Sequence, residues 1–392
     1  MIAKLPIIAP GITCGDLLAS ILVRPRKEII SEFTLALSDF IPVKYIYLTN
    51  SGIASFYLIL NALKEKSQKK EVILPAYTAG SLVVAVIKAG LKPVLCDISL
   101  VDFNLDREGL FKAFSPDTIA VTGVHMFGVP IQGIEELKQK IPPDIFLIED
   151  CAQAMGSRAG DKRVGSFGNI SFFSFNRGKN LPVCGGGCIA TNNKEIATAV
   201  ERTTTVLKNE NFLSKLAILF RIFAFSLVAN PLIYGLGYPF ISLFKDTAPP
   251  KDFAVRKISK FQARLGAILL RKNEEFVQAR YHNGMFLLHA LENIEGITLP
   301  QINEDEYAAF NRLPILFKDL NKKEMAKKRL WKNGIETSRM YLKSLHYMFN
   351  LGYKKADFPN AVYFAEHLLT LPVHPLVKEE DLLKMIKIIK SV

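Results

Sequence analysis

Short apolar segments alternate with helix-like segments from about Val43 to Thr191, and this alternation limits the fold more than any other feature of the chain. A strand buried on both faces is a continuous apolar run, whereas a covering helix repeats its apolar residues every three to four positions. Strands separated by helices are joined by crossovers, which place them parallel to one another. We therefore predict an α/β fold with a mainly parallel, seven-stranded type of sheet covered by helices. The strands are expected at 44–48, 71–74, 93–96, 119–124, 144–149, 170–174 and 187–191, and two of the helices at 54–63 and 80–89.

The sequence beyond residue 250 has a different order of elements. A long helix is predicted at 262–291, a strand at 307–317, and two helices at 324–333 and 380–389. This order is typical of a smaller C-terminal α+β domain. A chain of 392 residues is long enough for two domains. We predict an N-terminal and large ligand-binding domain over 1–211, an apolar insertion over 212–250, and a helical connection with the small domain over 251–392.

The predicted insertion contains 23 consecutive residues, 222–244, that carry no charge. This length meets the criterion for a membrane span, but Pro231, Gly235, Gly237 and Pro239 predict a broken helix. Two interpretations stay open. The segment 216–244 either lies in one leaflet as a peripheral membrane contact, or packs against its own subunit or a partner. In the first case Lys215, Arg221 and Lys245 would lie at the lipid headgroups.

Charge and cysteine content narrow the classes of partner. The net charge is +13 and is dispersed along the chain, and no nucleic-acid-binding motif accompanies it. We expect no nucleic-acid partner, whereas an anionic small molecule or an anionic membrane would suit this charge. The five cysteines form no C-x-x-C pair. This pattern is typical of reduced thiols in a cytoplasmic protein, so we expect neither disulfides nor a metal site.

A carboxylate and a lysine stand where such a fold binds ligands. Asp150 closes the apolar strand 145–149, and ligands of α/β sheets lie at the carboxyl ends of the strands. Asp is also a common turn residue at this position. Lys179 lies in a glycine-flanked turn after an aromatic strand. An exposed lysine there is a solvated turn residue, whereas a buried one loses proton affinity and becomes a nucleophile able to form a Schiff base.

Further motifs stand in a fixed order around these two residues: Ser51-Gly52-Ile53-Ala54, Pro75-Ala76-Tyr77-Thr78, His125-Met126-Phe127-Gly128, Glu149-Asp150-Cys151-Ala152-Gln153, Ser174-Phe175-Asn176-Arg177-Gly178-Lys179 and Leu371-Pro372-Val373-His374-Pro375. One such motif is a weak signal, but an ordered set at matching distances is specific. The set resembles that of the DegT/StrS-type sugar aminotransferases, which are fold-type-I transferases dependent on pyridoxal 5'-phosphate (PLP). The resemblance covers about 41–389.

The resemblance implies one catalytic residue, Lys179, and two residues that bind the ring of the cofactor, Asp150 and Gln153. Lys179 would hold the cofactor covalently and move a proton between substrate and cofactor. Asp150 would keep the pyridine nitrogen protonated, so that the ring accepts electrons. Gln153 would hydrogen-bond the phenolic oxygen of the cofactor.

The resemblance also implies a phosphate site and a substrate side. Ser51, Gly52 and Ile53 would begin a helix and bind the cofactor phosphate, aided by the Ser174 hydroxyl. Ser51 would serve at the same time as an ordinary helix N-cap. On the substrate side, the matching positions are Tyr341, Asn311 and Arg312.

Two departures from the family pattern concern the cofactor. Ile53 stands where the family usually has Thr, so one phosphate-binding hydroxyl is missing. Ala79 stands where an aromatic residue usually stacks on the cofactor ring, and Tyr77 is the candidate to replace that contact. These departures indicate a divergent subgroup.

The expected reaction transfers an amino group from glutamate or glutamine to a nucleotide-linked keto-sugar, for surface polysaccharide or related sugar biosynthesis. A different PLP-dependent reaction on a keto-sugar is one alternative, although the dehydratases of the family tend to replace the lysine by histidine. A regulatory homologue without turnover is another, because the stacking aromatic residue is missing. We expect a homodimer, since two-fold assemblies are the commonest soluble oligomers.

Overall fold

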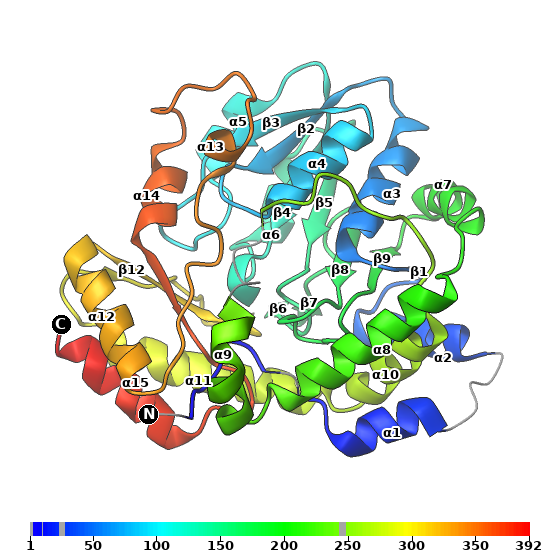
Figure 1. Cartoon of the computed structure of the whole chain (residues 1–392). Helices are drawn as coiled ribbons and strands as arrows, with labels where there is room; N and C mark the ends of the chain where they lie inside the picture. The colour runs from blue at the N-terminus through cyan, green and yellow to red at the C-terminus, as the bar shows by residue number, and fades with distance from the viewer. Residues whose placement is uncertain (1–2, 10, 23–27, 243–247) are drawn as a thin grey trace.

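A seven-stranded sheet forms the centre of the computed structural model, which describes residues 3–9, 11–22, 28–242 and 248–392. The strand order is β1-β9-β8-β5-β4-β2-β3, and only β9 runs against the others (Figure 1). The predicted mainly parallel sheet is therefore confirmed. The strands are β1 (Tyr45–Thr49), β2 (Glu71–Pro75), β3 (Lys92–Cys96), β4 (Thr118–Val124), β5 (Phe146–Asp150), β8 (Ile170–Ser174) and β9 (Gly187–Thr191).

Helices cover the sheet, which is why its strands are apolar along their whole length. All seven residues of β4 and all five of β9 are buried. One cluster of buried side chains joins the sheet to α3, α4 and α7, a second joins it to α2 and α10, and a third to α5 and α6. The helices around the sheet are α1 (Cys14–Leu22), α2 (Ile29–Phe40), α3 (Gly52–Lys64), α4 (Gly80–Lys88), α5 (Arg107–Ala113), the short 3-10 helix Met126–Gly128, α6 (Ile134–Lys140) and α7 (Lys194–Thr205).

The C-terminal part forms a smaller α+β unit with its own core. Its antiparallel sheet has the order β10-β12-β13, and buried residues of α11, α12 and α15 pack in one cluster with β12 and β13. A third small sheet, β11-β6-β7, joins Glu306–Tyr307 to a hairpin of the large domain. The domain limits drawn from the sequence stay predictions. The remaining elements are β6 (Arg158–Ala159), β7 (Lys162–Arg163), α10 (Lys260–Leu270), α11 (Asn273–Leu291), β10 (Ile297–Thr298), β11 (Glu306–Tyr307), β12 (Leu313–Phe317), α12 (Leu320–Lys332), α13 (Leu345–Met348), α14 (Pro359–His367), β13 (Leu368–Leu371) and α15 (Glu379–Lys390).

Two elements differ from their predictions. The single helix expected at 262–291 is two helices, α10 and α11, separated at Arg271 and Lys272. The ammonium of Lys272 pairs there with Asp16 of α1 at 2.7 Å, so a tertiary contact lies at the break. The strand expected at 307–317 is shorter: it spans only Leu313–Phe317, of which Leu313–Leu316 pairs with β13 and the last two residues with β10. Residues 308–312 instead form a buried connection toward the carboxyl edge of the large sheet, where the backbone N–H of Asn311 donates to the carbonyl of Phe127 at 2.8 Å.

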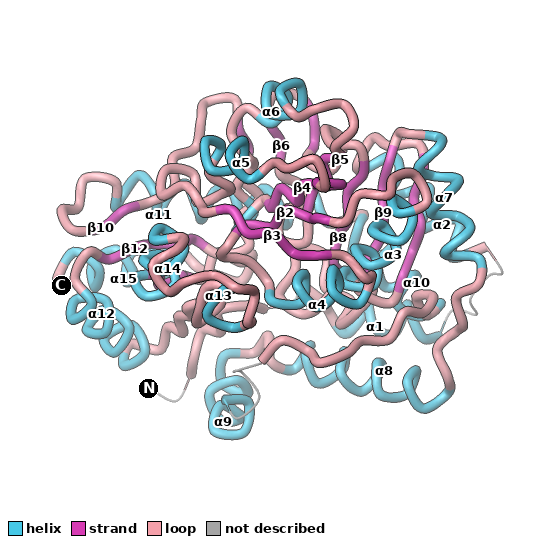
Figure 2. The backbone as a smooth tube through the Cα atoms, turned by 90° about the horizontal axis from the view of Figure 1, so that it is seen from above, coloured by secondary structure: helices cyan, strands magenta, loops and turns pink. Residues whose placement is uncertain are grey.

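The predicted apolar insertion contains two helices, α8 (Phe212–Leu227) and α9 (Pro231–Ser242). Figure 2 shows both helices along the lower edge of the molecule, apart from the seven-stranded sheet. Within the described ranges, no helix is long and apolar enough to cross a membrane.

Candidate active site

The candidate site lies at the carboxyl edge of the large sheet. Strands β4, β5 and β8 run in the same direction, so their last residues meet at one edge. Asp150 is the last residue of β5, and Ser174 is the last of β8. The turn that holds Lys179 follows β8 directly. The fold thus brings the predicted residues of two neighbouring strands together.

Asp150 is a buried carboxylate with one backbone donor. Its Oδ1 accepts a hydrogen bond from the backbone N–H of Ala152 at 2.9 Å, and the residue is 5% exposed. Burial raises the pKa of Asp150, while the Ala152 N–H and the positive charge of Lys179 act in the opposite direction. A buried carboxylate of this kind is suited to pair with a cation or a protonated ring nitrogen.

Lys179 is the titratable partner of this carboxylate. Burial lowers the pKa of Lys179 to about 8; the charge of Asp150 opposes that shift and the charge of Arg312 adds to it. Its Nζ makes no hydrogen bond or ion pair with any described residue. With a pKa of about 8, about a tenth of the amine is neutral at pH 7, far more than for an exposed lysine, so the amine is available as a nucleophile and base.

Two buried asparagines make hydrogen bonds around the turn that holds Lys179, and only one of them was predicted from the sequence. The amide nitrogen of Asn311 donates to the carbonyl of Gly178, as expected for a residue near the site. Asn180 was not predicted; its amide nitrogen donates to the carbonyls of Met155 at 3.1 Å and Ala309 at 2.8 Å. The sequence did offer a signal for Asn180, since it is a polar residue beside the apolar residues that follow Lys179. These contacts hold Gly178 and Asn180, the two chain neighbours of Lys179.

Ser51, Gly52 and Ser174 form a small polar cradle at the N-terminus of α3. The hydroxyl oxygen of Ser51 accepts a hydrogen bond from the backbone N–H of Ala54 at 3.2 Å, so the predicted N-cap is present. A Cβ on Gly52 would lie 2.8 Å from the Cβ and 3.2 Å from the hydroxyl of Ser174. A Cβ on Gly187 would lie 2.7 Å from the backbone nitrogen of Gly52. Glycine is thus needed on both sides of a helix N-terminus that can receive an anion.

Gln153 and Tyr77 are both buried and held by protein contacts. The Gln153 amide oxygen accepts from the backbone N–H of Phe127 at 3.3 Å. The Tyr77 hydroxyl donates to the carbonyl of Arg339 at 3.1 Å, and its ring lies 5.6 Å from that of Tyr341. Tyr77 thereby connects the large sheet to the predicted substrate side. Stacking of Tyr77 on a cofactor ring stays a prediction.

Arg312 and Tyr341 bring the substrate side to the same place. Arg312 donates to the hydroxyl of Ser338 at 3.1 Å, and its buried Nε has no partner among the described residues. Arg280, which the sequence reasoning missed, donates to the carbonyls of Phe310 and Asn311, both at 3.3 Å. Burial lowers the pKa of Arg280 to about 10, and the charge of Arg312 adds to this effect. Arg312 acts on the amine of Lys179, and Arg280 acts on Arg312, so this side of the site is positive.

Behind the site, Glu149 and His125 stabilise the loop that follows β5. Glu149 accepts hydrogen bonds from the backbone N–H groups of Gly165, Phe167 and Gly168 at 2.6–2.8 Å. His125 accepts from the N–H of Ile131 on Nδ1, so its proton lies on Nε2, which is 3.0 Å from Glu149. The donor atoms of His125, Glu149 and Cys151 lie within 4.8 Å of one another. Burial raises the pKa of the Cys151 thiol, so the thiol keeps its proton beside the hydrogen-bonded pair of His125 and Glu149.

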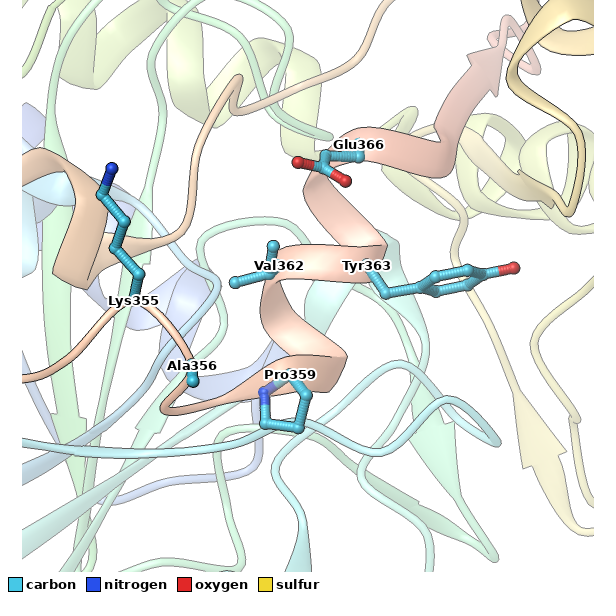
Figure 3. A pocket seen from close by; sticks show the side chains of 6 residues that line it. All are labelled: Lys355, Ala356, Pro359, Val362, Tyr363 and Glu366. Carbon is cyan, nitrogen blue, oxygen red and sulfur yellow. The ribbon is translucent and has the colours of Figure 1, made fainter.

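A separate surface hollow of about 380 Å³ lies on α14, lined by Lys355, Ala356, Pro359, Val362, Tyr363 and Glu366 (Figure 3). None of the predicted site residues lines it. The ring of Tyr363 points away from Val362 and Ala356 in this view and stacks on His367 at 3.9 Å. The hollow therefore does not belong to the candidate site.

The donor set of the site fits PLP. A phosphate needs N–H groups and hydroxyls, which the cradle at α3 supplies; an aldehyde needs a neutral amine, which Lys179 supplies; and a pyridine nitrogen needs an acid, which Asp150 supplies. The Asn311 amide oxygen and the Arg312 Nε are buried without a partner among the described residues. Such atoms are uncommon in folded proteins and indicate that a ligand completes the site.

Known proteins similar to this chain include several that modify sugars. It is 26% identical to the dTDP-4-amino-4,6-dideoxy-D-glucose transaminase of Shigella dysenteriae, over 91% of this chain and 88% of the relative. It is 26% identical to the spore coat polysaccharide biosynthesis protein SpsC of Bacillus subtilis, over 93% of this chain and 89% of the relative.

Solved structures agree with the fold. PseC of Helicobacter pylori, an aminotransferase involved in the biosynthesis of pseudoaminic acid, superposes with a TM-score of 0.77 at 20% identity, over 99% of this chain and 98% of that one. The sequence pattern described as the DegT/DnrJ/EryC1/StrS aminotransferase family matches residues 20–220 and 253–390. The resemblance predicted from the motifs is thereby confirmed, and the chain belongs to the DegT/DnrJ/EryC1/StrS aminotransferase family.

Proposed function

We propose that this chain uses PLP to transfer an amino group from glutamate or glutamine to a nucleotide-linked keto-sugar. The observation that carries the proposal is Lys179, a lysine with a pKa of about 8 that faces Asp150 at the carboxyl edge of the sheet. Relatives named as transaminases of nucleotide sugars support the substrate class. A relative named for spore coat polysaccharide biosynthesis supports a role in surface polysaccharides.

Each site residue has one task in this proposal. PLP, when bound, supplies the aldehyde and the electron-accepting ring. Asp150 holds the proton of the ring nitrogen, and the cradle of Ser51, Gly52 and Ser174 binds the phosphate. Gln153 donates to the ring hydroxyl. Lys179 would hold the aldehyde; its amine would take a proton from the donor carbon that loses the amino group and deliver a proton to the sugar carbon that gains it.

Arg312 and Tyr341 bind the substrate in this proposal. The unpaired Nε of Arg312 is suited to a carboxylate or a phosphate, because a guanidinium binds either through paired hydrogen bonds. The donor amino acid carries the first group and the nucleotide sugar the second. Burial raises the pKa of Tyr341, so its hydroxyl keeps its proton and serves as a hydrogen-bond donor.

The test is a screen of the purified chain, loaded with PLP, against a panel of nucleotide-linked keto-sugars with glutamate or glutamine. Consumption of the donor and amination of one sugar support the proposal. Lys179→Ala should abolish both turnover and the visible absorbance band of the bound cofactor. A chain that binds PLP through Lys179 but aminates no sugar of the panel would instead support the regulatory homologue. Retained activity in Lys179→Ala would refute the role of this lysine.

We further propose that the protein is a homodimer with the site near the subunit boundary. Closed two-fold assemblies are the commonest soluble oligomers. Sedimentation of the PLP-loaded protein tests this point, and a fully active monomer would contradict it.

A further inference from the structure

The outer face of α8 and α9 exposes a dense set of large apolar side chains. Nine residues of these two helices are between 40% and 74% exposed, and together we call them the α8–α9 face: Leu213, Leu216, Phe220, Phe223, Leu227, Leu232, Ile233, Leu236 and Phe240. An aromatic side chain covers about 150–250 Å², so the exposed parts of Phe220, Phe223 and Phe240 alone present roughly 300–500 Å² of apolar surface, and the six leucine and isoleucine residues add to it. The largest apolar patch on a typical monomer is roughly 300–600 Å². A face of this size indicates a partner.

The inner sides of the same helices are firmly packed. Ile222 and Phe225 of α8 are buried in the cluster that contains α2 and α10. Tyr234 of α9 is 2% exposed, and its hydroxyl donates to Glu336 at 2.5 Å. The ring of Tyr238 lies 4.2 Å from that of Trp331. Both helices are thus anchored to the protein on one side and apolar on the other, so their exposed face is not the result of poor packing.

The charge of this segment favours an anionic partner. Residues 211–245 contain no Asp or Glu, and they contain Lys215, Arg221 and Lys245. Lys215 and Arg221 are exposed on α8. A second copy of this chain would bring the same positive charges to a two-fold contact, where like charges repel. An anionic lipid surface instead attracts them while it takes up the apolar side chains.

The family pattern covers only part of the α8–α9 face. It matches residues 20–220 and 253–390, so the part of α8 after Phe220 and all of α9 lie outside it, with six of the nine residues of the face. A contact encoded by the sequence pattern of the family would therefore include at most three of the nine residues.

We infer that the α8–α9 face docks this protein on the surface of an anionic lipid bilayer. The two helices contain 16 and 12 residues, and no described helix is long and apolar enough to span a membrane. They lie in the plane of the interface, with their apolar side chains among the acyl chains and Lys215 and Arg221 at the headgroups. The inference does not rest on the proposed reaction.

The test is flotation of the full-length protein with phosphatidylcholine vesicles that contain or lack phosphatidylglycerol. Binding is expected with the anionic vesicles and should fall as salt is raised. The triple variant Phe220→Ser, Leu236→Ser, Phe240→Ser should lower the bound fraction at least about tenfold, because it removes three of the most exposed apolar groups. The double variant Lys215→Gln, Arg221→Gln should weaken binding to the anionic vesicles alone.

A matched control keeps the test specific. The triple variant Leu320→Ser, Leu376→Ser, Leu383→Ser changes side chains of the small domain that are 43–52% exposed, and it should float like the unchanged protein. Two results would overturn the inference. The first is an unchanged protein that does not float with anionic vesicles. The second is an α8–α9 triple variant that floats normally but sediments as a smaller species, which would assign the face to a second copy.

Discussion

Replacing Lys179 with methionine is expected to stabilise the PLP-free protein, although the same change should remove its activity. Burial lowers the pKa of Lys179 from 10.5 to about 8. Each tenfold change in proton affinity corresponds to about 1.4 kcal/mol, so the charged amine costs the folded protein up to about 3 kcal/mol. Methionine has a similar length and no charge, and it fills irregular spaces well. Residues that are costly to fold and needed for chemistry are common in active sites.

The dependence on pH follows from the direction of this pKa change. Below pH 8 the amine is protonated in both the folded and the unfolded chain, so the full cost is present at pH 7. Between pH 8 and 10.5 the folded chain binds fewer protons than the unfolded chain, and the stability of the unchanged protein rises with pH. Asp150 reduces the benefit of the substitution, because its carboxylate loses the attraction of Lys179. We therefore expect a gain of about 1–2 kcal/mol at pH 7 and a smaller gain near pH 10.

Urea unfolding of the PLP-free protein at pH 7 and pH 10 measures this effect. Lys328→Met is the control, since Lys328 is exposed on α12, and it should change the free energy of unfolding by less than about 0.5 kcal/mol. A Lys179→Met variant that is less stable than the unchanged protein at pH 7 would refute the argument. An equal gain at both pH values would show that relief of a buried charge is not the cause.

Three further predictions concern the remaining site residues. Asp150→Asn should keep the fold and lower turnover at least about 100-fold, because a neutral amide does not hold the ring nitrogen protonated. Steady-state kinetics measure the turnover and circular dichroism checks the fold; unchanged turnover would leave Asp150 as a turn residue only. Gly52→Ala should weaken PLP binding at least about tenfold, because the new Cβ would lie 2.8 Å from that of Ser174. Equilibrium dialysis measures PLP binding, with Gly15→Ala as the control, where the new Cβ would lie 3.6 Å from Thr13 Oγ1. Arg312→Gln should raise the KM of an anionic substrate about tenfold or more with a smaller change in kcat, and Arg312→Lys should restore part of it; a KM that is unchanged for every substrate would exclude the anion contact.

The sheet and its site edge were predictable from the sequence because burial on both faces leaves a simple pattern. Strands such as Ile170–Ser174 are continuous apolar runs, and a polar residue that closes such a run marks the ligand edge. Asp150 was predicted in this way. Lys179 needed the family motif as well, since a lysine in a turn is usually exposed. The structure adds the burial that separates the two interpretations of this lysine.

Features that depend on distant contacts were not predictable. Nothing in the local sequence ends the helix at Arg271, and the break instead accompanies contacts with the N-terminal segment. A Cβ on Gly11 would lie 2.5 Å from the ring of Phe276, one turn after the break. Arg280 lies within a predicted helix, and only the fold shows that its guanidinium reaches the carbonyl of Asn311. Such residues have no signal in a single sequence, because their partners are far away along the chain.

The segment that follows the α8–α9 face packs against Gly80, the neighbour of Ala79, where the family usually has an aromatic residue. The trace from residue 248 to α10 crosses the outer side of α4 and α3 (Figure 1). A Cβ on Gly80, next to Ala79, would lie 2.6 Å from the ring of Pro249. The ring of Phe253 packs edge-on against Tyr57 of α3 at 5.7 Å. A bulky side chain near the start of α4 would therefore compete with this connection for space, so the small residues Ala79 and Gly80 and the path of the connection are best understood as one adaptation.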